Sequence, residues 1–279
     1  MLLGTSSCGD GRTEPGTVTV PPNPSPGPSP APTDTPTPTA AVPTCQPVTA
    51  DPTSLSPYSD PAFRRVLDNA LTLQWPVSVN ACMNTAALQA FAIDPDNFYR
   101  DDAGRLVFSF ANGVNDSNAS VTTRMELRGA NFDAAAADKV LDASFRLPVI
   151  PNRSGSFTIA QVFGDTDGAP ILRVFFSSSR EGQANHLWAA YRRGLGDDNT
   201  SFTDLGAAPT PDETGRIRIR YNIGGAIELL SSGLDSTVRL DENFAFWTQA
   251  GKRTYFKAGC YLQSAGACEV RFTALTFDR

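Results

Sequence analysis

From Cys45 onward, the sequence alternates short segments rich in Val, Ile, Phe, Thr and Tyr with turns built from Gly, Asn, Asp and Ser. This pattern predicts strands, and many such strands at short spacing are typical of a two-sheet sandwich or jelly roll. Helical periodicity is scarce, and the best helix candidate is Asp60 to Leu71, with Pro61 in its first turn. We therefore predict an all-β, antiparallel fold. The eleven strand candidates are Arg105 to Ala111, Thr123 to Gly129, Lys139 to Val149, Phe157 to Gly164, Ile171 to Ser177, His186 to Arg193, Arg216 to Asn222, Ala226 to Ser231, Thr237 to Leu240, Tyr255 to Gln263 and Glu269 to Phe277.

The first 45 residues lack this pattern. Residues 1–8 resemble the end of a bacterial lipoprotein signal, in which small residues precede a lipidated cysteine, here Cys8. The basic start and most of the apolar part of such a signal are missing, so either the start codon is assigned too late or Cys8 is incidental. Residues 9–45 are rich in Pro, Thr and Ser, and eleven of the 22 prolines lie between Pro15 and Pro43. This composition favours an extended tether in front of a domain at 46–279. We expect an exported bacterial protein, either secreted or an outer-membrane lipoprotein attached to the membrane through Cys8.

The charge balance argues against nucleic acid as the partner. Lys and Arg total 23 and Asp and Glu total 29, which gives a formal net charge of -6. An acidic protein can still carry a locally basic site. The sequence also has no apolar run of about eighteen residues, so we expect no membrane-spanning helix.

The cysteines fit an exported chain. With Cys8 assigned to lipidation, the even number that remains suits disulfides. Three pairings can be drawn among Cys45, Cys82, Cys260 and Cys268. We favour Cys260 with Cys268, because a tight reversal between them would set the two opposite each other on neighbouring strands; Cys45 then pairs with Cys82. No Cys-x-x-Cys occurs and the chain has one histidine, so we expect no structural metal site.

The segment from Tyr255 to Gln263 carries the most unusual side chains. With the two-residue period of a strand, one face presents Tyr255, Lys257, Gly259, Tyr261 and Gln263, and the other face is apolar. Two phenols, an ammonium and an amide on one side suit a site that handles a charged polar polymer. The alternative from this segment alone is an amphipathic strand that faces solvent.

Two further segments indicate a function for this strand. Arg124, Glu126 and Arg128 alternate in Arg-x-Glu-Leu-Arg, which alone would suit a solvated strand. Gln161 and Phe163 share one side of Gln-Val-Phe. Together with Tyr-Phe-Lys-Ala-Gly-x-Tyr-x-Gln, in this order, the segments resemble the alginate lyases of polysaccharide lyase family 7. The resemblance covers roughly Leu67 to Arg279 and includes Phe98 to Phe108. It implies a β-jelly roll whose concave sheet forms a groove for a polyuronate chain, and therefore a polysaccharide lyase with an acidic polysaccharide as partner.

Carried over by position, the resemblance implies that Arg124 and Gln161 contact the uronate carboxylate and that Tyr261 is the catalytic phenol. It implies no metal or organic cofactor, and we expect a monomer. The residues expected to line the groove are Lys257, Arg128, Glu126, Gln263, Tyr255, Phe163 and Arg173.

The chemistry of a lyase explains these residue types. The enzyme removes the proton at C5, alpha to a carboxylate, and expels the oxygen at C4. The intermediate carries a second negative charge at the carboxyl group, so preformed cationic and amide donors there lower the barrier. A tyrosine acts as the base only where neighbouring cations favour its phenolate. Arg124 and Lys257 are the candidates for that role.

One position departs from the family. Its middle motif normally ends in a histidine, the usual second catalytic group, where this chain has Phe163.

One hypothesis is a lyase for a β-linked mannuronate or glucuronate polymer with Tyr261 as both base and acid, because one group suffices when hydrogen and leaving group depart from the same side of the ring. A second is a non-catalytic, tethered module that binds acidic polysaccharide. In a third, Phe163 stacks on a sugar and the substrate is another acidic glycan. His186, the one histidine, is more readily explained as an ordinary residue at a strand end.

Overall fold

The structure is a computed structural model of the chain. The segments predicted as signal and tether, with Cys8 and Cys45, lie outside the described residues. All helices and strands reported below belong to one compact unit, Asp34–Arg279. The structure describes residue 57 and residues 60–74, 80–82, 97–113, 124–133, 136–151, 155–196, 200–222, 226–234, 237–240, 244–264 and 266–278.

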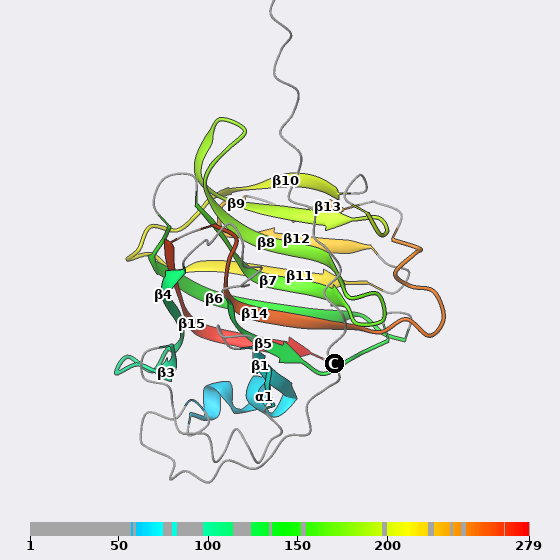
Figure 1. Cartoon of the computed structure of the whole chain (residues 1–279), viewed down its shortest axis with the longest axis horizontal. Coiled ribbons are helices and arrows are strands. Elements are labelled where there is room, and N and C mark those ends of the chain that lie inside the picture. Colours follow the sequence, from blue (N-terminus) through cyan, green and yellow to red (C-terminus); the bar gives the residue numbers. More distant parts are fainter. Residues whose placement is uncertain are drawn as a thin grey trace, which may run out of the picture. The chain divides into compact units, whose positions relative to one another are not determined.

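Two antiparallel sheets pack face to face and form a β-sandwich (Figure 1). The eight-stranded sheet has the order β10-β9-β8-β7-β14-β5-β1-β2, and the seven-stranded sheet has the order β13-β12-β11-β6-β15-β4-β3. The all-β, two-sheet prediction is therefore confirmed. The strands are β1 (Ala70–Gln74), β2 (Asn80–Cys82), β3 (Phe98–Arg100), β4 (Leu106–Gly113), β5 (Arg124–Gly129), β6 (Lys139–Val149), β7 (Ser156–Gly164), β8 (Ala169–Arg180), β9 (Gln183–Arg192), β10 (Thr200–Ala207), β11 (Gly215–Tyr221), β12 (Ile227–Ser231), β13 (Val238–Leu240), β14 (Thr254–Leu262) and β15 (Gly266–Asp278).

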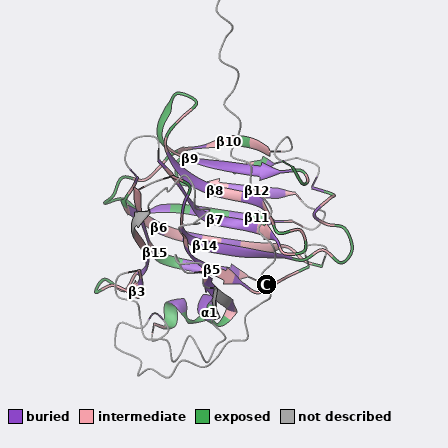
Figure 2. Ribbon diagram, viewed as in Figure 1, coloured by how far each residue is buried: buried purple, intermediate pink, exposed green. Residues whose placement is uncertain are grey.

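The core lies between the sheets because alternate side chains of each strand point inward. In β11, Ile217, Ile219 and Tyr221 are buried while the arginines between them are exposed. Figure 2 shows the same alternation as stripes of buried and exposed positions along the strands.

The one helix of the described residues, α1 (Pro61–Asn69), packs its apolar side into the same core. The carboxylate of Asp60 accepts a hydrogen bond from the backbone N–H of Ala62 at 2.9 Å and caps the helix. The helix ends two residues earlier than predicted, because the chain continues as β1 from Ala70. Within the described part of the chain, no helix is both long and apolar enough to cross a membrane.

All eleven predicted strands are present, and four further strands were missed. β2 and β3 have three residues each, too few for a periodic signal. β1 overlaps the end of the predicted helix. β10 is an edge strand of polar composition, with Thr, Ser and Asp at positions where a central strand would carry apolar residues.

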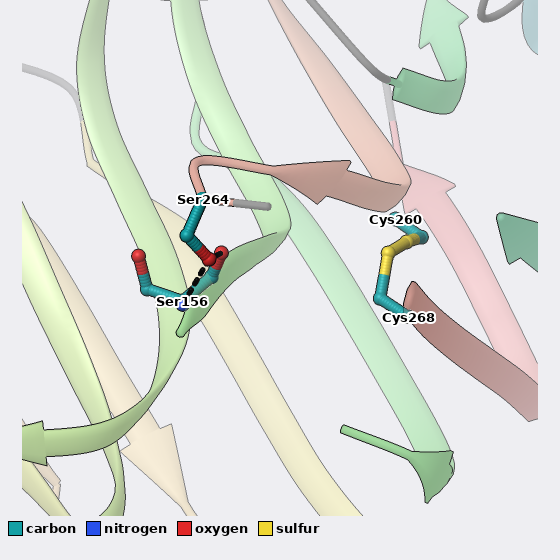
Figure 3. The surroundings of a disulfide bond; sticks show 4 residues. All are labelled: Ser156, Cys260, Ser264 and Cys268. Carbon is teal, nitrogen blue, oxygen red and sulfur yellow. Dashed lines mark hydrogen bonds between the residues drawn. A yellow bond between two sulfur atoms is a disulfide. The ribbon is translucent and has the colours of Figure 1, made fainter. Parts of the chain in front are cut away.

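A disulfide joins Cys260 and Cys268, whose Cα atoms are 6.3 Å apart (Figure 3). The sequence favoured this pairing but placed the two cysteines on neighbouring strands. Instead, Cys260 lies on β14 of the eight-stranded sheet and Cys268 on β15 of the seven-stranded sheet. Both are fully buried, so the bond runs through the core from one sheet to the other. The predicted pairing of Cys45 with Cys82 lies outside the described residues, since only the backbone of Cys82 is described.

Candidate active site

The three segments singled out in the sequence lie on adjacent strands, because β14 pairs with β5 on one side and with β7 on the other. Their polar residues share the face of the eight-stranded sheet that points away from the core, here called the site face. The residues between them, such as Met125, Phe256 and Ala258, belong to the core. The register opposes Tyr261 to Arg124, Gly259 to Glu126, Lys257 to both Arg128 and Gln161, and Tyr255 to Phe163.

Gly259 allows β5 and β14 to lie this close. Its φ of 152° is unfavourable for residues with a Cβ, and an added Cβ would lie 2.1 Å from the carbonyl oxygen of Met125. The glycine in the middle of the motif is therefore required by the pairing of the two strands that carry the site.

Tyr261 is the only residue of β14 that is not buried. The guanidinium carbon of Arg124 lies 4.3 Å from the centroid of its ring. Nη1 of Arg124 donates to Oε1 of Gln74 on β1 at 3.3 Å. Its Nε is buried and has no hydrogen-bond partner among the described residues. A partly exposed phenol beside a cation with a free donor suits a site where negative charge develops.

Three charged or polar side chains form a buried network beneath this surface. Glu126 is 0% exposed, Lys257 1% and Gln161 2%. Nζ of Lys257 donates to Oε1 of Gln74 at 2.8 Å and lies 3.9 Å from Oε2 of Glu126. Nε2 of Gln161 donates to Oε1 of Glu126 at 2.5 Å. Burial lowers the pKa of Lys257 to about 7, against the opposing effect of Glu126. The network lies under the site face and presents almost no surface to a polymer.

At the other end of β14, the side chain on the site face is covered from solvent. Tyr255 is buried, with the guanidinium carbon of Arg128 3.9 Å from its ring centroid. Nη2 of Arg128 donates to Asn131 at 2.8 Å and to Asp165 at 3.0 Å. Burial raises the pKa of Tyr255 to about 12, although Arg128 acts in the opposite direction. Tyr255 therefore stays protonated near neutral pH.

Phe163 on β7 lies opposite Tyr255, at the same end of the site. Its ring centroid is 5.3 Å from that of Tyr255 and 4.5 Å from Nζ of Lys257. The ring is only partly buried, so part of it remains on the site face.

The remaining predicted residues lie around this centre. Arg173 on β8 opposes Gln161 in the register of β7 and β8. Gln263 follows β14 and is exposed, and its Nε2 donates to Oγ1 of Thr158 at 3.1 Å. His186 is on β9, where Nδ1 lies 2.8 Å from Asp204 on β10. Two strands, β7 and β8, separate β9 from β14, so His186 is not next to Tyr261.

Sequence reasoning missed four residues of the site. Gln74 and Thr158 contact the predicted residues directly, and Asn131 and Asp165 hold Arg128. None of the four is a position of the three motifs, so no local signal marks it. Within the described residues, no group of three or more His, Cys, Asp and Glu side chains is arranged to hold a metal ion.

A sequence model of the alginate lyase family matches residues 67–279, which include every strand of the site. The chain belongs to the alginate lyase family, polysaccharide lyase family 7. It is accordingly a polysaccharide lyase. No curated protein sequence matches the chain.

Solved alginate lyases share the fold of this lyase. AlyC3 gives a TM-score of 0.65 at 21% sequence identity, with 81% of this chain and 96% of AlyC3 covered. The family 7 enzyme A1-II' gives 0.61 at 22% identity, with 78% of this chain and 97% of that chain covered. An alginate lyase from Pseudomonas aeruginosa gives 0.61 at 23% identity and covers 76% of this chain and 98% of its own.

Proposed function

We propose that this lyase cleaves a β-linked polyuronate, polymannuronate or a glucuronan-like polymer, by β-elimination. The observation that carries the proposal is the setting of Tyr261. It is the only unburied side chain of β14, and it lies against the cation of Arg124. In this proposal, Tyr261 acts first as the base and then as the acid.

The electron flow assigns the other roles. Tyr261 takes the C5 proton, the electron pair of the C5–H bond forms the C4–C5 double bond, and the C4–O bond breaks. The same phenol then returns the proton to the departing oxygen. Arg124 and Gln161 stabilise the charge that develops on the carboxylate. Gln161 has two N–H groups, of which Glu126 accepts one, and we assign the second to the substrate. Because Gln161 is only 2% exposed, this contact requires the groups that cover it to move when the substrate binds.

The identity of residue 163 leads to the preference for β-linked substrates. In β-D-mannuronate or β-D-glucuronate, the C5 hydrogen and the C4 oxygen leave from the same side of the ring, which one tyrosine can serve. In α-L-guluronate they leave from opposite sides, which calls for a second group, and Phe163 has no titratable atom. Solved complexes of this fold contain dimannuronate in AlyC3 and a GGG product in A1-II', so the proposed preference rests on residue 163 and not on the fold.

The test is the ultraviolet absorbance of the unsaturated product with polymannuronate, glucuronan and polyguluronate as substrates. We expect product from the first or the second polymer, and none above background from Tyr261→Phe. Comparable cleavage of polyguluronate would contradict the restriction to β-linked polymers. Phe163→His, which restores a titratable group, should raise the rate on polyguluronate relative to polymannuronate.

A second candidate substrate is another acidic glycan, with Phe163 in an altered subsite. It is favoured by the partly exposed ring of Phe163 beside Tyr255 on the site face. Product from such a glycan, with none from the alginate and glucuronan polymers, would select it. Absence of product from every polymer, with binding retained, would identify a tethered binding module instead.

We also propose that the enzyme is an exported monomer held by residues 9–45. In one form Cys8 is lipidated, and in the other the protein is secreted. Membrane fractionation of the wild type and Cys8→Ser separates these forms, since only a lipidated protein changes from membrane to soluble fractions in the variant. The molar mass of the purified domain, measured by light scattering, tests the monomer.

A further inference from the structure

A second aromatic cluster lies on the eight-stranded sheet, apart from the sandwich core. Phe175 on β8 and Trp188 and Ala190 on β9 are buried but form a cluster of their own. Phe202 on β10 extends it, with its ring centroid 6.4 Å from that of Phe175. At 41% exposure, Phe202 is one of three large exposed apolar residues among the described residues.

The cluster continues the row of side chains that begins at Tyr261. In the sheet, Tyr261 opposes Thr158, Thr158 opposes Phe175, and Phe175 opposes Trp188. These positions therefore share the site face and cross the sheet perpendicular to its strands. With strands about 4.8 Å apart, β9 is about 14 Å from β14, a distance that several sugar units of one polymer span.

The cluster also contains hydrogen-bond donors without acceptors. The guanidinium carbon of Arg180 lies 3.6 Å from the ring centroid of Phe202 and 5.3 Å from that of Trp188. Nε of Arg180 and Nε1 of Trp188 are buried, and neither has a partner among the described residues. Trp188 as a whole is only 3% exposed. By contrast, Nε1 of Trp247 donates to the carbonyl of Arg192 at 2.7 Å, as buried indoles usually do.

We propose that Phe202, Arg180 and Trp188 form a distal subsite for a uronate unit of the polymer cleaved at Tyr261. The proposal rests on the proposed function for its ligand. Arg180 covers one face of the Phe202 ring, and we assign the other face to the apolar C–H face of a pyranose. The donors of Arg180 and Trp188 suit the sugar carboxylate, because an arginine fork pairs with a carboxylate through two parallel bonds.

Nearby carboxylates do not prevent this binding. Glu181 lies 3.2 Å from Nη2 of Arg180 but is itself exposed, so a ligand can replace it at little cost. Asp204 is held by His186 and by the backbone N–H of Gly206 at 2.8 Å. For the ligand to reach Trp188, the side chain of Arg180 has to move off the indole.

The first test compares long and short substrates. For the wild type and Phe202→Ala, kcat/KM is measured on long polymer and on an oligosaccharide too short to reach from Tyr261 to β10. We expect the ratio of the two values to fall about tenfold in Phe202→Ala, mainly through KM on the polymer. The matched control is Val149→Ala, an exposed apolar residue on the other sheet, which should keep the wild-type ratio. A wild-type ratio in Phe202→Ala would overturn the subsite.

Arg180→Met removes the positive charge of residue 180 but keeps an apolar side chain of similar length, so it tests whether the charge binds the sugar carboxylate. We expect the same ratio to fall in this variant, and the fall to be larger at low ionic strength, where charge pairing is less screened. Equal melting temperatures for all variants would show that the change in ratio does not come from unfolding. A fall that does not depend on salt would contradict the role of Arg180 as the carboxylate partner.

A binding experiment separates this proposal from the proposed function. In the Tyr261→Phe background, polyuronate should change the fluorescence of Trp188. The contribution of Trp188 is the difference in tryptophan fluorescence between this protein and the same protein with Trp188→Phe. The change should disappear with Phe202→Ala. If the wild type cleaves no polyuronate but this signal saturates, the subsite stands and the lyase proposal fails. If the wild type cleaves polymer and the signal is absent, the subsite fails and the lyase proposal stands.

Discussion

The two ends of β14 carry the same residue type in opposite settings. Tyr261 is partly exposed beside Arg124, whereas Tyr255 is buried beneath Arg128, and burial raises the pKa of Tyr255 to about 12. Both phenols point to the same face and both have an arginine over the ring. The difference is in what surrounds the arginine: Arg128 is held by Asp165 and Asn131, whereas Nε of Arg124 has no acceptor among the described residues. We therefore interpret Arg128 and Tyr255 as structural residues, and Arg124 and Tyr261 as the pair that can contact a substrate.

The sharpest test of this contrast exchanges each tyrosine for phenylalanine. Tyr261→Phe should lower kcat by about 10³-fold, because it removes the group proposed to transfer the proton. Tyr255→Phe should leave kcat within a few-fold of the wild type. Initial rates of product absorbance on the best polymer measure both variants. Equal losses would show that the two phenols share a role, and the comparison would fail.

The same contrast applies to the arginines. Arg124→Met should reduce kcat by about 10²-fold through loss of a donor at the developing charge. Arg128→Met should mainly lower the free energy of unfolding, by about 1–2 kcal/mol, since Asp165 and Asn131 lose their shared partner. Kinetics and urea unfolding on both variants measure the two effects. If Arg128→Met is stable but inactive, Arg128 also takes part in catalysis, and the contrast between the two arginines is wrong.

Gly259 lies between the two ends of β14 and allows β14 to pair closely with β5. Gly259→Ala should destabilise the fold by about 2–4 kcal/mol, because the new methyl group meets the backbone of β5. Ala258→Gly, which removes a buried methyl from the same strand, is the matched control and should cost about 1 kcal/mol. Urea unfolding gives both values. Similar costs for the two variants would show that the sheet adapts to a side chain at position 259.

Lys257, which lies between the two ends, is tested by the pH dependence of stability. Its pKa is about 7 in the folded protein, against 10.5 for an ordinary lysine, so the unfolded chain binds more protons between these values. The free energy of unfolding of the wild type should therefore rise between about pH 7 and pH 10, relative to Lys257→Met. Urea unfolding across this range measures the difference. A difference that does not change with pH would show that the folded protein keeps Lys257 charged.

Much of this arrangement could be predicted from alternation alone. The two-residue period puts Tyr255 and Tyr261 on one face and Cys260 on the other, and the structure agrees. Burial of Glu126 and Lys257 could not be predicted, because alternation identifies a face but not what covers it. Gln74 was missed because β1, the strand that carries it, overlaps the end of the predicted helix and has no motif of its own. The sheet that each cysteine belongs to also depends on pairings with distant strands, which the seven residues between the two cysteines do not specify.

Cys260 immediately precedes Tyr261, and its bond to Cys268 ties the strand of the proposed base to the opposite sheet. Among the described residues, this is the only disulfide. Protein produced in a reducing cytoplasm would fold with two thiols at fully buried positions, where oxidants reach them slowly. The specific activity of such a preparation would then depend on the fraction of oxidised chains as well as on correct folding. Counting free thiols in the denatured protein should therefore accompany every activity measurement on this enzyme.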